Sequence, residues 1–85
     1  MRVTSHRKFD KQYSKLPKKI KNKFKERASL LIENPDSPLL KVHILSGKKY
    51  PLKSMNVTAD YRALFIDNGK VITFFEIGSH SELYE

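Results

Sequence analysis

The sequence predicts an α+β fold in which a helical hairpin packs on a mainly antiparallel four-stranded sheet. Two aromatic and β-branched segments near the C-terminus flank an Asn-Gly pair, which is a strong signal for a β-hairpin. Apolar residues in the first third recur with the 3.6-residue period of a helix. A chain of 85 residues can bury one small core, so we expect a single domain over residues 1–85 in the order β-α-α-β-β-β.

The N-terminal third is expected to form a short edge strand and then the two helices. Residues 1–4 are the strand candidate, and Thr4 or Ser5 would cap the first helix because a side-chain oxygen can accept a hydrogen bond from a free backbone N–H. Pro17 suits the first turn of the second helix, which should end at Asn34 because the following residue is a proline. The apolar stripes of the two helices comprise Phe9, Tyr13 and Leu16, and then Ile20, Phe24, Ala28 and Leu31.

The rest of the chain is expected to supply the sheet. Residues 35–49 contain two prolines and a Ser-Gly pair, which indicate a connector without a long helix. A strand is expected over residues 50–57, and residues 61–66 and 71–77 would be the arms of the hairpin. The second arm is apolar almost throughout, which indicates a central strand buried on both faces. Gly78 would end it, and a short polar tail with a histidine and a tyrosine would follow.

The net charge of +8 is concentrated in one segment. Residues 7–27 hold ten Lys or Arg and two acidic residues, so this segment accounts for the whole excess. A cationic face of this kind suits a polyanion, such as RNA, DNA or an acidic protein. The alternative interpretation is a helix face whose lysines serve solubility.

Composition excludes several classes of function. The chain has no cysteine, which excludes disulfides, zinc–thiolate sites and thiol catalysis. No apolar run approaches the roughly 18 residues of a membrane-spanning helix, and the N-terminus lacks the apolar region of a secretory signal, so we expect a cytoplasmic protein. The three histidines lack metal-ligand spacing and there is no glycine-rich phosphate loop, so we expect no metal and no cofactor.

Polar side chains are expected to meet at one end of the sheet. Arg62 lies inside an apolar strand, where a charge is costly unless it is paired or faces a ligand. A structural ion pair with Asp60 or Glu76 is as good an interpretation of Arg62 as a ligand site. His80 follows the central strand and can move protons near neutral pH, although a single loop histidine is more often inert. Tyr84 is the third candidate at this end, and Asp60, Lys53, His43 and Asn56 are further ones.

Such a group of side chains fits one reaction without a metal. RNA carries its own nucleophile, the 2′-hydroxyl, so a protein need supply only a base, an acid and positive charge for the pentavalent phosphate. Composition alone does not establish this activity.

The C-terminal motifs resemble those of the RelE/ParE toxin superfamily of bacterial toxin–antitoxin pairs, and RelE-type mRNA interferases most of all. The resemblance extends over size, element order and the basic helical hairpin, and rests on S-M-N-V-T, D-Y-R-A-L-F and K-V-I-T-F-F-E-I-G-S-H-S-E-L-Y. The most specific piece, I-G-S-H-S-E-L-Y, is similar to the I-G-T-H-x-x-V/L-Y/F ending of many members. The resemblance implies ribosome-dependent cleavage of mRNA in the A site of the 70S ribosome and a cognate antitoxin as partner.

The resemblance also implies roles for single residues. His80 matches the histidine assigned to proton transfer, Arg62 the arginine that stabilises the phosphate, and Tyr84 the aromatic residue that contacts mRNA. Asp60 and His43 match an acidic residue and an upstream histidine of the histidine-rich members, and Lys53 matches a strand lysine of the lysine-rich members. The lysines expected to dock on ribosomal RNA are Lys18, Lys19, Lys21, Lys23 and Lys25.

Two departures leave other functions open. Asn56 stands where histidine-rich members have a further catalytic histidine, and Met55 replaces a second strand lysine. A ParE-like toxin that inhibits DNA gyrase without nuclease activity is therefore the alternative. A degenerate toxin that binds only its antitoxin is a third possibility.

Overall fold

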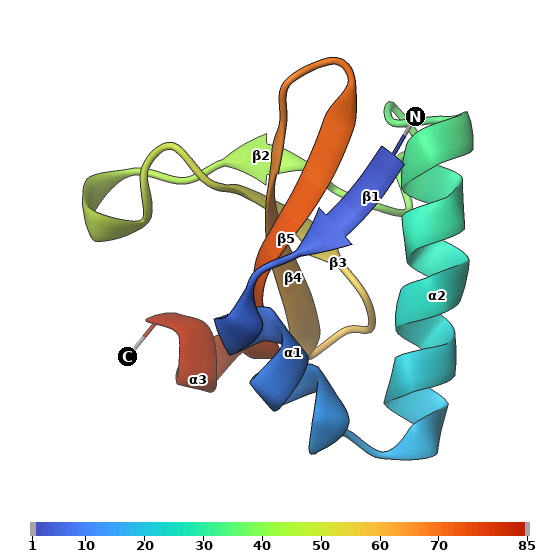
Figure 1. The fold of residues 1–85 in the computed structure, drawn as a ribbon, viewed down its shortest axis with the longest axis vertical. Helices are drawn as coiled ribbons and strands as arrows, with labels where there is room; N and C mark the ends of the chain where they lie inside the picture. Colours follow the sequence, from blue (N-terminus) through green and yellow to red (C-terminus); the bar gives the residue numbers. More distant parts are fainter. Residues whose placement is uncertain (1, 85) are drawn as a thin grey trace.

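The computed structural model describes residues 2–84, which form a five-stranded mixed sheet with helices packed against it (Figure 1). The strand order is β1-β5-β4-β3-β2. β1 (Arg2–Ser5) runs parallel to β5 (Val71–Ser79). β4 (Tyr61–Asp67), β3 (Lys53–Asn56) and β2 (His43–Ile44) continue the sheet in antiparallel pairs. The α+β class and the central position of the second hairpin arm are confirmed.

Two helices form the hairpin that the sequence predicts. α1 (Arg7–Ser14) follows β1, and α2 (Lys18–Glu33) ends at Asn34 as expected. The predicted cap at Thr4 or Ser5 is wrong, because the side chain of His6 accepts the hydrogen bond from the Lys8 backbone N–H instead. β1 extends through Ser5, so neither predicted residue is free to cap. Met1, the first residue of the predicted strand, lies outside the described residues.

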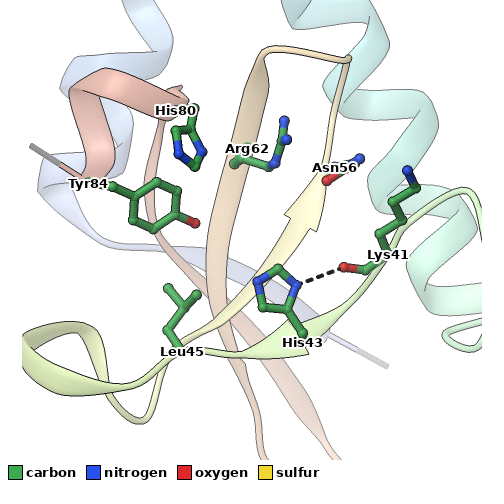
Figure 2. Close-up of a pocket in the computed structure, with 7 residues that line it drawn as sticks. All are labelled: Lys41, His43, Leu45, Asn56, Arg62, His80 and Tyr84. Carbon is green, nitrogen blue, oxygen red and sulfur yellow. Dashed lines mark hydrogen bonds between the residues drawn. The ribbon is translucent and has the colours of Figure 1, made fainter.

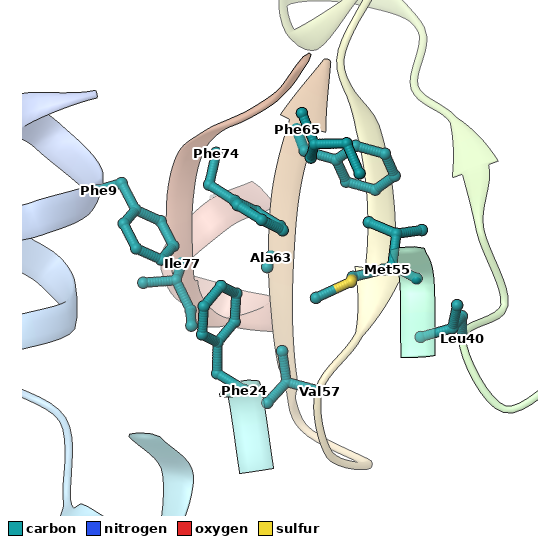
Figure 3. Close-up of a cluster of buried hydrophobic side chains, with 11 residues drawn as sticks. Phe9, Phe24, Leu40, Met55, Val57, Ala63, Phe65, Phe74 and Ile77 are labelled. Atoms are coloured by element: carbon teal, nitrogen blue, oxygen red, sulfur yellow. The ribbon is translucent and has the colours of Figure 1, made fainter. Parts of the chain in front are cut away.

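The core lies between the helices and one face of the sheet (Figure 3). Phe9 from α1, Phe24 from α2 and Phe74 from β5 pack with ring centroids 4.9–5.6 Å apart. Burying an aromatic side chain of this size contributes about 1.5–3 kcal/mol, so this cluster fixes the helical hairpin on the sheet. The sheet adds further buried side chains: Met55, Val57, Ala63, Phe65, Ile72 and Ile77.

A β-bulge in β5 changes which residues face the core. Phe74 pairs with Phe65, but the next pair joins Glu76 to Leu64, so Phe75 is an extra residue in β5. Before the bulge the even-numbered residues of β5 face the core, and after it Ile77 does. The bulge therefore places Ile77 in the apolar core and leaves Glu76 outside it, where its carboxylate can reach Lys8 of α1.

Four expectations about the sheet and its connections need correction. The sheet has five strands, because two residues of the predicted connector form β2 against β3. A short 3₁₀ helix (Gly47–Lys49) follows β2, and the strand predicted over residues 50–57 begins only at Lys53. β5 continues through Gly78 to Ser79. The predicted polar tail is a helix, α3 (His80–Tyr84). None of the helices found in residues 2–84 is long and apolar enough to span a membrane.

Candidate active site

A pocket of about 470 Å³ lies on the sheet face opposite the core, where α3 and the β2 segment approach each other (Figure 2). α3 supplies one wall, and the segment around β2 supplies the opposing wall. Strands β3 and β4 contribute side chains between them. The lining residues are Lys41, His43, Leu45, Asn56, Arg62, His80 and Tyr84.

Strand register places Arg62 and Asn56 in this pocket. The two residues are directly opposite each other in the antiparallel pair of β4 and β3. Their neighbours Ala63 and Met55 are fully buried in the core, and successive side chains of a strand point to opposite faces. Arg62 and Asn56 must therefore point to the other face, which the helices α1 and α2 leave uncovered.

Arg62 is held by backbone carbonyl groups. Its Nη1 donates to the carbonyl oxygens of Thr58, Ala59 and Tyr61 at 3.0–3.3 Å. No carboxylate within residues 2–84 forms an ion pair with it, so the structural ion pair with Asp60 or Glu76 is absent. Within the described residues, no carboxylate offsets the charge of the guanidinium at the pocket, so an anion could pair with it there.

Glu76 is instead paired with two lysines. Its carboxylate lies 2.8 Å from Lys49 Nζ and 3.1 Å from Lys8 Nζ. Burial by itself would raise the pKa of Glu76, but the hydrogen bonds and charges of the two lysines outweigh it and hold the pKa below its ordinary value. Glu76 thus ties α1 and the 3₁₀ helix after β2 to the central strand.

A capping box fixes the start of α3. The Glu82 carboxylate accepts a hydrogen bond from the Ser79 backbone N–H at 2.8 Å, and Ser79 Oγ accepts one from the Glu82 N–H at 3.2 Å. The hydrogen bond from the Ser79 backbone lowers the pKa of Glu82, and the Ser79 side chain adds to this effect. A Cβ at Gly78 would lie 3.2 Å from Glu82 Oε1, a tight contact that would push on the carboxylate of the capping box. The pattern Ser-x-x-Glu is visible in the sequence and could have predicted this helix.

α3 presents His80 and Tyr84 on one side. Their rings are tilted by 55° with centroids 4.7 Å apart. The Tyr84 hydroxyl donates to Ser54 Oγ on β3 at 3.2 Å, and the His80 backbone N–H donates to the Asp60 carbonyl at 2.9 Å. Leu83 points the other way and is buried. The imidazole of His80 is exposed at the pocket, where it can exchange protons with a bound molecule.

The opposing wall carries His43 and Lys41. His43 Nδ1 lies 3.1 Å from the Lys41 carbonyl oxygen, which favours the tautomer with the proton on Nδ1 and leaves Nε2 as an acceptor. Lys41 has φ of +46°, a left-handed conformation that costs a residue with a Cβ roughly 1–2 kcal/mol. Sequence reasoning missed Lys41 and Leu45 as pocket residues, and no pattern in the sequence distinguishes them.

No protein-family model matches the sequence, and no curated protein matches it. Solved structures do match. YafQ from E. coli strain BL21(DE3) has a TM-score of 0.85 at 24% identity over 100% of both chains. A chain of the RelE–RelB complex from Pyrococcus horikoshii OT3 has a TM-score of 0.71 at 26% identity over 92% of both chains.

Two further structures extend the comparison. YafQ in the E. coli DinJ–YafQ toxin–antitoxin complex has a TM-score of 0.80 at 24% identity, covering 98% of this chain and 96% of that chain. The YoeB/ParE toxin from Agrobacterium tumefaciens has a TM-score of 0.76 at 16% identity, covering 94% of this chain and 99% of that chain. The chain has the fold of the RelE/ParE toxin superfamily.

Within this RelE/ParE fold, five of the seven residues predicted for catalysis or substrate binding line one pocket: His43, Asn56, Arg62, His80 and Tyr84. Asp60 and Lys53 do not line it. Asp60 is an exposed loop residue that reaches His80 through its backbone carbonyl. Lys53 is paired with Ile44 at the β2 edge.

The lysines expected to dock on RNA all lie on α2, outside the pocket of the RelE/ParE fold. Lys18, Lys19 and Lys25 are exposed. Lys21 lies over the Tyr13 ring, with Nζ 5.8 Å from its centroid, and Lys23 Nζ is 3.5 Å from Glu26 Oε1. No group of three or more His, Cys, Asp or Glu side chains in the described part of the chain is arranged to hold a metal ion.

Proposed function

We propose that this protein is the toxin of a type II toxin–antitoxin pair and a ribosome-dependent endoribonuclease that cuts mRNA in the A site. The observation that carries the proposal is the convergence of two histidines and an arginine without a carboxylate partner in one open pocket. The chain also shares its fold with toxins solved in complexes with DinJ and RelB, which supports a cognate antitoxin as its partner.

The proposed reaction uses the RNA's own 2′-hydroxyl. One imidazole takes the proton as the 2′-oxygen bonds to the adjacent phosphorus, and the other gives a proton to the departing 5′-oxygen. The products are a 2′,3′-cyclic phosphate and a 5′-hydroxyl, so atoms and charges balance without a metal. His80 and His43 lie on opposing walls of the pocket, which suits this division of roles (Figure 2).

Positive charge and orientation come from the neighbouring side chains. Arg62 would bind the phosphate as negative charge develops, and Lys41 adds a second cation on the opposing wall. Asn56 cannot act as a base, but its amide can hydrogen-bond the substrate. Tyr84 has one face against His80 and its hydroxyl on Ser54, so it is held rigidly enough to orient a base. Asp60 and Lys53 have no part in this proposal.

Primer extension on an mRNA under translation in a reconstituted system tests the proposal. We expect discrete cuts within codons that require both the protein and ribosomes. His80→Asn should reduce the cleavage rate by about 10²–10⁴-fold, the usual contribution of a general acid or base.

His6→Asn is the matched control, because His6 is also exposed but caps α1, a position at which asparagine is favoured. This variant should cut like the wild type. Absence of cuts at concentrations that stop bacterial growth would contradict nuclease activity and favour a protein target such as DNA gyrase.

A further inference from the structure

Three further hollows continue from the candidate active site around α3 to α1. The first lies beside the 3₁₀ helix and shares Tyr84 with the active-site pocket. The second lies between α1 and the end of β5 and shares Lys8 and Glu82 with the first. The third lies at the start of α1 and shares Lys8 and Lys11 with the second. Because each hollow shares lining residues with the next, the three lie side by side on the surface and form a path, here called the α1 track, that adjoins the candidate active site.

Lysines line the α1 track. Lys8, Lys11 and Lys15 are spaced by three and four residues, which places them on one stripe of α1. Lys48 and Lys49 line the part nearest the active site. Lys11 and Lys15 are exposed and have no ion pair among residues 2–84, so their charges are available to a partner.

The two acidic residues of the α1 track are already engaged. Glu76 is paired with Lys8 and Lys49, and Glu82 accepts the hydrogen bond of the capping box. The basic side chains of the track outnumber these two carboxylates, so the track has a net positive charge. The second hollow also has an apolar floor that includes Leu16 and Tyr61, against which a base could pack.

We propose that the α1 track binds the single-stranded mRNA that flanks the scissile phosphate. A path of linked hollows that curves around a five-residue helix fits a flexible strand better than a stiff duplex. Its continuity with the active site is what identifies the ligand as the substrate's own strand, so the inference rests on the proposed nuclease function.

The test is the affinity for a single-stranded RNA made uncleavable by 2′-O-methyl groups and measured by fluorescence anisotropy. The variant is Lys11→Ala/Lys15→Ala. The matched control is Lys18→Ala/Lys19→Ala, which removes the same charge from exposed positions of α2. Alanine is the best helix former, so both pairs should fold.

We expect the α1 variant to bind more weakly and to lose about 1.4 from the slope of log affinity against log salt, since each phosphate contact to a single strand contributes about 0.7. The α2 variant should keep the wild-type slope. Lengthening the RNA from a few nucleotides at the active site should tighten binding to the wild type but not to the α1 variant.

The proposal would be overturned if both variants lost the same RNA affinity, or if the α1 variant lost none. Tighter binding of an acidic peptide than of RNA, with the same dependence on Lys11 and Lys15, would assign the surface to a protein partner and also overturn it. Primer extension with the wild type and the α1 variant separates this result from the proposed function. Cuts by both proteins with no effect of the α1 variant on RNA affinity refute the proposed role of the α1 track alone, whereas track-dependent affinity without any cuts refutes the proposed nuclease and with it the assignment of the bound RNA as substrate.

Discussion

Replacing Ser79 by alanine should raise the undocked population of α3 without unfolding the domain. Ser79 is the N-cap of α3 and accepts the Glu82 backbone hydrogen bond through its hydroxyl. A helix of five residues has no stability of its own in water, so it depends on its cap and its packing. Both His80 and Tyr84 are on this helix, and their placement at the pocket depends on it.

The magnitude follows from the few interactions that hold α3. Loss of a serine cap costs about 1 kcal/mol, in a range of roughly 0.5–2. Burial of Leu83, which is 3% exposed, contributes about 1.5–3 kcal/mol, and the hydrogen bond from Tyr84 to Ser54 about 1 kcal/mol. Removing 1 kcal/mol raises the population of the undocked helix about fivefold. Global stability should change little, because the core lies on the other face of the sheet.

Hydrogen exchange of the α3 amides and primer extension measure the two effects. Exchange should speed up about fivefold in Ser79→Ala, and cleavage should fall by no more than the fraction of molecules in which α3 is undocked. Ser81→Ala is the control, because Ser81 is exposed on the same helix and accepts no capping hydrogen bond in the described structure. If the two variants exchange and cut alike, the capping box does not hold the site and the reasoning is refuted.

The capping box also predicts a dependence on pH. Glu82 has a pKa below its ordinary value of 4.5 in the folded protein, so its carboxylate stabilises α3 above that pH. This contribution is lost as the pH falls through the lowered pKa. Exchange of the α3 amides, corrected for the intrinsic rate, should therefore speed up in acid in the wild type. Glu82→Gln, which keeps an acceptor but does not titrate, should show no such step.

Two further predictions concern the ion pairs of Glu76 and the backbone conformation of Lys41. Glu76→Ala should lower stability by about 1–2 kcal/mol, less than a fully buried ion pair, because Lys8 and Lys49 are partly exposed and can turn to water. The midpoint temperature of thermal unfolding should fall by about 4–8 °C for each kcal/mol lost. Glu33→Ala is the control, because Glu33 is exposed and has no ion pair in residues 2–84. If Glu76→Ala lowers the midpoint no more than Glu33→Ala does, the prediction is contradicted. Lys41→Gly should leave the free energy of unfolding unchanged or raise it by up to about 1 kcal/mol, whereas Lys41→Val should lower it by about 1–2 kcal/mol. Urea unfolding of both variants, which lose the same charge, tests the left-handed conformation, and equal results would exclude strain at this residue.

The parts of the fold that sequence analysis predicted are those with strong local signals. The hairpin follows from Asn68-Gly69, where Asn68 Oδ1 accepts hydrogen bonds from two backbone N–H groups and Gly69 has φ of +89°. The two helices follow from apolar stripes whose aromatic residues are found in the core. In both cases the signal lies within a few residues of the feature it predicts.

The features that sequence analysis missed depend on distant partners. β2 has two residues and exists because β3 pairs with it, so no local pattern could reveal it. The bulge at Phe75 is invisible in a segment that is apolar on both faces, since the alternation that would expose a shift is absent. α3 was missed for another reason, because its Ser-x-x-Glu box was available but its helix is too short for an apolar period.

Sequence analysis could predict most residues of the candidate site, but it could not predict how the two walls of the pocket are arranged. His80, Arg62 and Tyr84 could be grouped because they flank one hairpin end. His43 was a candidate from the sequence, but the sequence did not show that it lies on an opposing wall, which is positioned by β2 and by the left-handed Lys41. Asp60 is close in the sequence to Arg62, yet a bend turns its side chain out of the pocket.

The place of β5 in the chain sets the order in which this protein can assemble. Ribosomes make the chain from its N-terminus, so β1, both long helices and β4 leave the exit tunnel before the strand that joins them. β1 has no strand to pair with until β5 has been made, since Arg2 pairs with Val71. Phe9 and Phe24 likewise lack the β5 side chain on which both pack, Phe74. A nascent chain that stops before β5 therefore has neither a closed core nor His80. The candidate active site could therefore form only after the last part of the described chain has been made, which separates synthesis of the protein from the formation of this site.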